Sequence, residues 1–152
     1  MTVDGMPRAN VRRRRARELA LRGLYEWQVG RGDASGIAAA LEADPEFAGV
    51  DGEYFRELWS GAVRGYDALV ATLAPDVDRN VSELAPIERA LLVIGTWELA
   101  HRLEIPYRVV ISEGIELAKR YGGTDGYKFV NAVLDRVAAR LRADEIRAAR
   151  AR

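Results

Sequence analysis

The stretch "PIERALLVIGTWELAHR", residues 86–102, constrains the fold more than any other part of the sequence. Apolar residues occupy most of its helical circumference, and a helix that is apolar on nearly every side has to be buried by its neighbours. Pro86 suits the first position of a helix, where its missing N–H costs nothing. We therefore expect a central, buried helix over 86–102.

The elements around this helix are predicted to be helices too. Apolar residues recur at the 3.6-residue period over 12–29, around 37–41, and over 53–73, 108–121 and 125–141. No segment alternates apolar and polar residues between turn signals at hairpin spacing. The sequence predicts an all-α protein of six or seven helices, most simply two helical bundles packed together.

The same pattern predicts the domain organisation. We expect a disordered N-terminal arm over 1–11 and a single domain over 12–143, followed by a frayed tail over 144–152. Within the domain, the N-terminal bundle is expected over about 12–75 and the C-terminal bundle over about 80–143.

The composition excludes several classes of protein. The 152 residues contain no cysteine, which excludes disulfides and thiolate metal sites, and no apolar run approaches the roughly 18 residues of a membrane span. The single histidine, His101, has no serine or metal constellation around it. Glu98 is expected among apolar neighbours as the satisfied partner of an arginine or tyrosine. We expect a cytoplasmic protein that is not an enzyme and holds no metal or cofactor.

Positive charge is concentrated at the start of the chain although the whole chain is neutral. Residues 1–31 hold 8 basic and 3 acidic residues (8 − 3 = +5), whereas residues 32–60 hold 1 and 7 (1 − 7 = −6). The run "VRRRRARELA" places arginines at a helix start, where cations oppose the macrodipole. Arg13, Arg14 and Arg17 are spaced to form one cationic face. This predicts an anion-binding surface, with a merely solvated tail as the alternative.

The first predicted helix also carries an unusual aromatic residue. If Ala16, Ala20 and Gly23 face the core, Tyr25 points outward with Leu21 and Glu18 beside it. An outward tyrosine and leucine on a polar face is a modest indication of a protein-binding patch.

The stretch "RYGGTDGYKFVNAVLDR", Arg120 to Arg136, is a second candidate surface. A glycine loop delivers the chain to a helix start, where unpaired backbone N–H groups favour phosphates. Basic and aromatic residues surround that loop, and the amide of Asn131 is able to read base edges. This combination favours single-stranded RNA, whose bases splay outward. The members of the cluster are Lys119, Arg120, Tyr121, Tyr127, Lys128 and Phe129.

Phe129 has two interpretations. It lies at the edge of the apolar stripe of its helix, in line with Arg136 and Arg140, where a ring is able to stack on an unpaired base. The alternative is that the ring folds inward and covers the core.

Four segments resemble one family. "RRRARELALRGLYEWQ", "IERALLVIGTWEL", "IPYRVVISEGIELAKRYG" and "DGYKFVNAVLDR" occur in this order between Arg13 and Arg136, and together they resemble NusB, the bacterial transcription antitermination factor. The resemblance implies a NusB-like fold of two helical bundles and a non-catalytic RNA-binding protein. It also implies partners: NusE, which is also a small-subunit ribosomal protein; boxA-type single-stranded RNA; and the RNA polymerase antitermination complex that promotes ribosomal RNA transcription. No membrane partner is expected, because no apolar run is long enough to span a membrane.

The resemblance carries site residues over by position. Tyr25 and Glu88 fall where the family meets NusE. The residues that fall on the family's RNA surface are Arg13, Arg14, Arg17, Tyr121, Asp125, Lys128, Phe129 and Asn131.

The sequence also departs from the family. Gly126-Tyr127 stands where many relatives have Ser-His, Ala132 stands where a glycine is usual, and Tyr121 occupies a position often held by Phe. The acidic stretch 32–60 matches poorly and receives no role. An RNA methyltransferase with an N-terminal NusB-like domain is a weak rival, since no Rossmann or methyl-donor motif is present. The other rival is a helical protein-interaction module without specific RNA binding.

Overall fold

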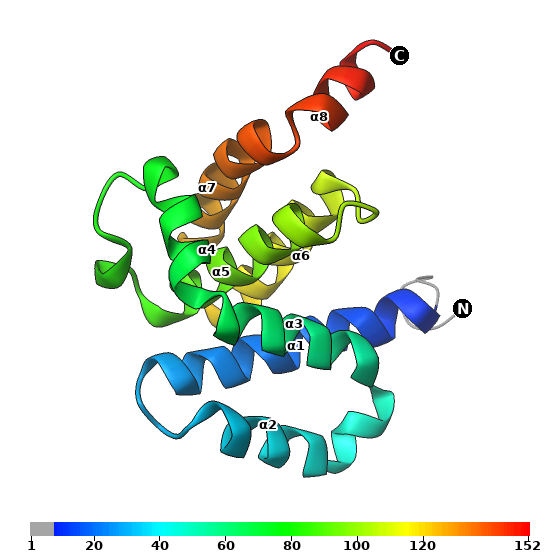
Figure 1. Cartoon of the computed structure of the whole chain (residues 1–152), viewed down its shortest axis with the longest axis vertical. Coiled ribbons are helices and arrows are strands. Elements are labelled where there is room, and N and C mark those ends of the chain that lie inside the picture. The colour runs from blue at the N-terminus through cyan, green and yellow to red at the C-terminus, as the bar shows by residue number, and fades with distance from the viewer. Residues whose placement is uncertain (1–7) are drawn as a thin grey trace. The chain divides into compact units, whose positions relative to one another are not determined.

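The computed structural model describes residues 8–152, and within that range every regular element is a helix. The chain divides into two compact units, one ending at Gly65 and the other beginning at Tyr66. Figure 1 shows the elements in chain order from blue to red. The all-α prediction is confirmed. Eight α-helices and three short 3-10 helices lie in the described range, somewhat more than the six or seven helices expected.

The first unit consists of α1 (Arg8–Gln28), α2 (Ala34–Ala43), the 3-10 helix η2 (Pro45–Gly49) and α3 (Gly52–Arg64). Gly30 follows α1 with a φ of 77°, a left-handed conformation that glycine adopts without strain. Asp33 and Asp51 cap α2 and α3 by accepting the N–H groups of Gly36 and Tyr54.

Gly23 allows α1 to approach both other helices of the first unit. A Cβ at this position would lie 2.7 Å from the ring of Trp59 on α3 and 2.9 Å from Leu41 on α2. Ala16 and Ala20 are buried on the same face, as predicted. Small residues along one face of α1 therefore bring it into close contact with α2 and α3.

The second unit begins with α4 (Tyr66–Leu73) and the 3-10 helices η3 (Ala74–Asp76) and η4 (Val81–Glu83). It continues with α5 (Pro86–His101), α6 (Tyr107–Tyr121), α7 (Gly126–Leu141) and α8 (Ala143–Arg150). Helix α5 is buried without interruption from Ala90 to Leu99 and packs against α4, α6 and α7, which confirms the central helix. Gly95 makes room for Leu134 of α7, which would lie 2.7 Å from a Cβ there.

The elements differ from the predicted boundaries at three places. The helix expected over 53–73 is two helices, because α3 ends at Gly65, whose N–H donates to Gly61. Helix α4 then packs on α5, so the units separate at 65/66 and not near residue 75. Helix α1 begins at Arg8, so 8–11 are helical rather than a disordered arm, and residues 1–7 lie outside the described range.

The third difference is the C-terminus, where helix α8 replaces the expected frayed tail. Its acidic residues lie in the first turn and its basic residues in the last turn, which complements the helix dipole. The carboxylate of Glu145 also accepts the backbone N–H of Tyr107 at 3.0 Å, at the start of α6. These contacts give the terminal segment a reason to remain helical.

Arg142, between α7 and α8, ties three segments of the second unit together. It is 4 % exposed, and its guanidinium donates to backbone carbonyls at the end of α5 and in the following loop. Its Nη1 also donates to Glu145 at 2.5 Å. The carbonyls belong to Glu98, Leu99, Arg102 and Ile105.

None of the helices within residues 8–152 combines the length and the apolar character that crossing a membrane requires.

Candidate functional site

The arginines at the start of α1 are engaged by the acidic stretch of the first unit. Arg12 donates to the carbonyls of Ala48 and Val50 at 3.1 and 2.8 Å, and its own carbonyl accepts the N–H of Asp51. The guanidinium of Arg15 lies against Gly49, 2.6 Å from where a Cβ would stand. Residues 45–51, which received no role from the sequence, thus hold the arginine run in place.

The ring of Tyr54 on α3 forms cation–π contacts with two further arginines. The guanidinium carbon of Arg13 lies 4.4 Å from the ring centroid, and that of Arg17 lies 5.7 Å away. Such cation–π contacts hold the two arginines against α3. Because α1 begins at Arg8, both lie beyond its first turn, and the expected position of the arginine run at a helix start is wrong. Arg17 is 3 % exposed, so the expected exposed face of Arg13, Arg14 and Arg17 is wrong for Arg17. Arg13 and Arg14 are half-buried.

The predicted protein-binding patch on α1 is smaller than expected. Tyr25 is half-buried, with the guanidinium of Arg31 5.4 Å from its ring centroid, but Leu21 is 1 % exposed. The expectation that Leu21 faces outward is wrong, because α1 is buried over more of its circumference than the stripe of small residues covers. Tyr25 remains as a partly accessible aromatic residue.

The loop from Tyr121 to the start of α7 gathers basic and aromatic side chains, as predicted. Lys119 and Lys128 place their ammonium groups 5.1 and 5.9 Å from the ring centroid of Tyr127. Tyr121 is 37 % exposed, and the guanidinium of Arg120 lies 5.5 Å from its centroid.

Polar side chains accompany these rings at the start of α7. Lys128 also forms an exposed ion pair with Asp125, at 3.4 Å. Asn131 is exposed one turn further along the helix. The segment therefore presents cations, rings and an amide to solvent.

Phe129 lies between the two interpretations that the sequence left open. Its side chain is half-buried, so it is neither a core residue nor fully exposed. The guanidinium of Arg79, from the segment before η4, lies 5.2 Å from its ring centroid. Sequence reasoning missed Arg79, because 50 positions separate it from the ring.

Arg136 and Arg140 hold α7 against α4 and η3 and do not extend the basic face. Arg136 donates twice to the carbonyl of Asp76, at 3.1 and 2.8 Å. Arg140 donates to the carbonyl of Thr72 and to the carboxylate of Asp76. The alignment of these arginines with Phe129 therefore reflects packing within the second unit.

Glu88 lies beneath the glycine loop. It is 8 % exposed, and its Oε1 accepts the N–H of Gly123 at 3.1 Å. A Cβ on Gly126 would stand 2.2 Å from that oxygen, and one on Gly122 would stand 2.9 Å from it. Glu88 was expected to face a protein partner, but the structure buries it here. The glycines provide the space, but they stand more than 30 positions from Glu88 in the chain, so the sequence contains no signal of this contact.

A cavity of about 250 Å³ opens beside this carboxylate. Phe129 and Arg79 line one part of it, Leu84 contributes an apolar surface, and Glu88 and Gly123 contribute polar groups. Asp125 and Phe129, both predicted RNA-binding residues, are thus brought together with Glu88, which was predicted to bind NusE.

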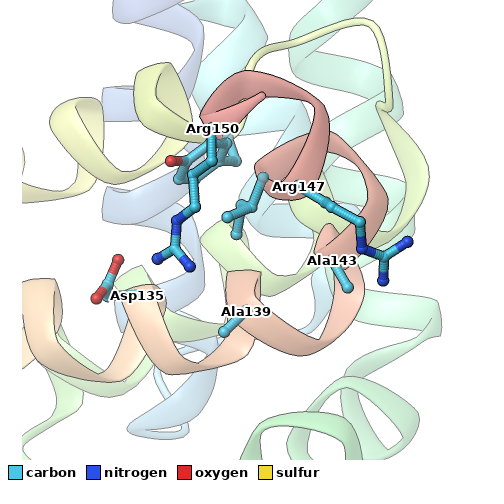
Figure 2. Close-up of a pocket in the computed structure, with 7 residues that line it drawn as sticks. Asp135, Ala139, Ala143, Arg147 and Arg150 are labelled. Carbon is cyan, nitrogen blue, oxygen red and sulfur yellow. The ribbon is translucent and has the colours of Figure 1, made fainter. Parts of the chain in front are cut away.

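A second cavity, of about 350 Å³, lies between α7 and α8. Figure 2 shows Arg150 extending on the side of this cavity where Asp135 lies, and Arg147 extending on the other side. Arg147 pairs with Asp144 at 3.1 Å. None of the predicted site residues lines this cavity.

Glu98 and His101 are the two residues that the sequence analysis considered for catalysis. Glu98 is 1 % exposed, as predicted, and His101 is exposed near the end of α5 with the ring of Trp97 6.0 Å away. Across residues 8–152, no cluster of three or more His, Asp or Glu side chains is arranged to hold a metal ion.

Comparison with known proteins gives the family. The model of the NusB family matches residues 14–139, which is most of the chain. The chain belongs to the NusB family. The transcription antitermination protein NusB of Methylobacillus flagellatus is 51% identical over 144 residues, covering 95% of this chain and 94% of that protein. Its counterpart in Azoarcus sp. is 51% identical over 145 residues, again covering 95% and 94%.

A solved structure agrees with this assignment. T. maritima NusB is 28% identical, superposes with a TM-score of 0.72, and covers 89% of this chain and 92% of that one. Both curated relatives are named as transcription antitermination proteins. Family membership therefore confirms the resemblance and the fold expected from the sequence.

Proposed function

We propose that this NusB-family protein is a transcription antitermination factor of the cytoplasm that binds boxA-type single-stranded RNA together with NusE. Family membership supports antitermination as the general role. The RNA and NusE parts of the proposal rest on the resemblance of individual segments and on the accessible side chains of those segments.

The observation that carries RNA binding is the half-buried ring of Phe129 at the end of a glycine loop. Lys128 and Asn131 are exposed beside it. Aromatic stacking holds single-stranded bases with little sequence preference, while cations hold the phosphates. Arg13 and Arg14 of the first unit are proposed as additional phosphate contacts, and Tyr121 and Asp125 as neighbours of the bases.

Arg17 receives a different role in this proposal. Because it is buried against Tyr54, it is proposed to fix the start of α1 and so to position Arg13 and Arg14, without contacting RNA itself.

NusE binding is proposed at Tyr25. Its ring is partly accessible, and a tyrosine supplies both apolar area and a polar hydroxyl, as residues that dominate protein interfaces often do. Tyr25→Asp is expected to abolish NusE binding while leaving the helical circular dichroism and the melting temperature nearly unchanged. A large drop in melting temperature would instead assign Tyr25 to the core.

The test of RNA binding pairs Phe129→Ala with Phe55→Ala, a matched control at a fully buried ring in the first unit. Phe129→Ala is expected to weaken RNA affinity by about 1–3 kcal/mol with little loss of stability. Phe55→Ala is expected to cost about 3–5 kcal/mol in the free energy of unfolding. RNA titration and urea unfolding of the same samples separate the two effects.

Salt dependence distinguishes the proposal from a helical protein-interaction module. Arg13→Ala with Lys128→Ala is expected to weaken RNA binding and to flatten its dependence on salt, because phosphate contacts set that slope. If affinity and slope match the unmutated protein, the module without specific RNA binding is the better description.

A further inference from the structure

The cavity between α7 and α8 holds two opposite charges. Arg150 of α8 and Asp135 of α7 both line this space of about 350 Å³, and Figure 2 shows them on the same side of it. No residue between 8 and 152 forms a hydrogen bond or an ion pair with either side chain. A ligand that carries an acceptor close to a donor is therefore able to meet both charges at once.

The remaining walls of the cavity are largely apolar and are held in place. Ala139, Ala143 and Ile146 contribute alkyl groups, and Tyr107 contributes its ring. The N–H of Tyr107 donates to Glu145 at 3.0 Å, which ties α8 to the start of α6. The volume of about 350 Å³ lies at the lower end of the roughly 300–1,000 Å³ of small-ligand pockets. The cavity therefore has room for one apolar group beside the two charges.

A second guanidinium is available on the other side of the cavity. Arg147 extends there (Figure 2) and pairs with Asp144 at 3.1 Å, but the two side chains are 76% and 95% exposed. An exposed pair of this kind contributes little to stability, so Arg147 is able to exchange Asp144 for a ligand at small cost. The hydroxyl of Tyr107 accepts from Arg108 at 3.1 Å, and its own O–H remains able to donate. The cavity thus offers a ligand more donors than acceptors.

This cavity is separate from the segments proposed to bind RNA and NusE. Asp135 lies more than two helical turns along α7 from Gly126, or about 14 Å at 1.5 Å per residue. Tyr25 belongs to the first unit. The match to the family model ends at residue 139, and several lining residues lie beyond it: Ala143, Ile146, Arg147 and Arg150.

The lining residues decide between three kinds of ligand. A phosphate of RNA would pair with the arginines, but Asp135 would repel it and the alkyl wall would gain no contact. A basic side chain would pair with Asp135 but would meet two guanidinium groups. The C-terminal residue of a peptide has a carboxylate for Arg150, since guanidinium and carboxylate match in shape and charge. It also has a backbone N–H for Asp135 and a side chain for the alkyl wall.

We propose that this cavity binds the C-terminal residue of a partner protein, an apolar residue whose carboxylate pairs with Arg150. The backbone N–H of that residue donates to Asp135, and its side chain packs on Ile146 and the neighbouring alanines. Arg147 adds a longer-range attraction from the other side. The proposal does not depend on RNA or NusE binding, and it adds a protein contact at the end of α7 remote from the glycine loop.

The experiment titrates short probes into the isotope-labelled protein and follows its backbone amides by NMR. The first probe is N-acetyl-Gly-Gly-Leu with a free carboxylate, and the second is the same peptide with a C-terminal amide. The free acid is expected to shift the amides of Tyr107, Ala139 and residues 143–150. It should bind about tenfold more tightly than the amide, because a hydrogen bond between two charged groups is lost in the amide.

Arg150→Gln and Arg64→Gln form a matched pair, because each removes an exposed arginine from the last turn of a helix. Arg64 lies in the first unit, outside the cavity. Arg150→Gln should weaken binding of the free-acid peptide about tenfold, whereas Arg64→Gln should leave it unchanged. Melting temperatures of both variants establish that each is folded.

Asp135→Ala separates a peptide site from a simple anion site. Removal of a negative charge would strengthen the binding of any anion that only pairs with the arginines. The proposed ligand loses the acceptor for its N–H, so its affinity should fall about threefold. Stronger binding of the free-acid peptide by Asp135→Ala overturns the proposal.

Other outcomes also overturn it. Equal binding of the acid and the amide, or no shift with either, means that the cavity recognises no C-terminal carboxylate. Free leucine and an oligouridylate are the remaining probes. Shifts with free leucine but not with the acetylated peptide assign the cavity to a free amino acid. Shifts of the same amides with the oligouridylate alone assign the arginines of α8 to RNA phosphates.

Discussion

Arg142 and Glu88 are two charged side chains of the second unit that are almost equally buried, at 4 % and 8 % exposure, but their surroundings differ. Arg142 donates to four backbone carbonyls and to Glu145, so its donors are largely used within the unit. Glu88 accepts one backbone N–H. The difference teaches that burial alone does not indicate a role. Arg142 holds several segments of the second unit together, whereas Glu88 holds the glycine loop through one hydrogen bond.

Replacement of Arg142 should have the largest effect on stability. Arg142→Met leaves the carbonyls at the end of α5 without their donor and Glu145 without its cation. Breaking such a buried set typically costs about 3–5 kcal/mol in the free energy of unfolding. Urea unfolding measures it, and Arg147→Met, at a side chain 76% exposed, is the control expected to change stability by less than about 0.5 kcal/mol. A loss for Arg142→Met no larger than the control's would remove the contrast with Glu88.

Gly126→Ala should have the next largest effect, because the new Cβ would overlap the carboxylate of Glu88. Forcing an extra methyl group into a packed site costs about 1–3 kcal/mol. If Glu88 is the group displaced, Glu88→Ala should relieve most of that cost. A double-mutant cycle of the two changes by urea unfolding then shows strong non-additivity. Additive effects would mean that the loop and not the carboxylate absorbs the clash.

Glu88→Gln should change stability less than either of these. The amide oxygen still accepts from Gly123, and the neutral side chain avoids the desolvation cost of a charge. We expect the free energy of unfolding to change by less than about 1 kcal/mol, in the stabilising direction if at all. A large destabilisation would place Glu88 with Arg142 as an architectural charge.

Tyr66→Phe should have the smallest effect, and this effect should change with pH. Burial raises the pKa of the Tyr66 hydroxyl above its ordinary value of 10.0, and the nearby Arg89 partly opposes this. Because the folded-state pKa is the higher one, the contribution is fully present below pH 10 and is lost as the pH rises through the raised pKa. The variant should lose less stability than the unmutated protein between neutral pH and pH values above 10, measured by urea unfolding.

The sequence predicted the central helix α5 well. Apolar residues cover most of its circumference, and such a helix is stable in water only when its neighbours bury it. It also predicted the cluster of rings and cations at 119–131, because these residues are close together in the chain. It failed for Arg17, Leu21 and Glu88, whose burial is set by other segments. A helical wheel describes the faces of one helix only. It does not include contacts from other segments, such as that of Tyr54 with Arg17 or that of Gly123 with Glu88.

The contacts of Arg142 also bear on local opening of the structure. One side chain joins the last turn of α5 and the loop that follows it, and through Glu145 it reaches the first N–H of α6. Segments that share such a junction are expected to open together, as one cooperative unit of hydrogen exchange. The amide of Tyr107 should therefore exchange with solvent deuterium in step with the helix that follows Arg142, although more than 30 positions separate them along the chain.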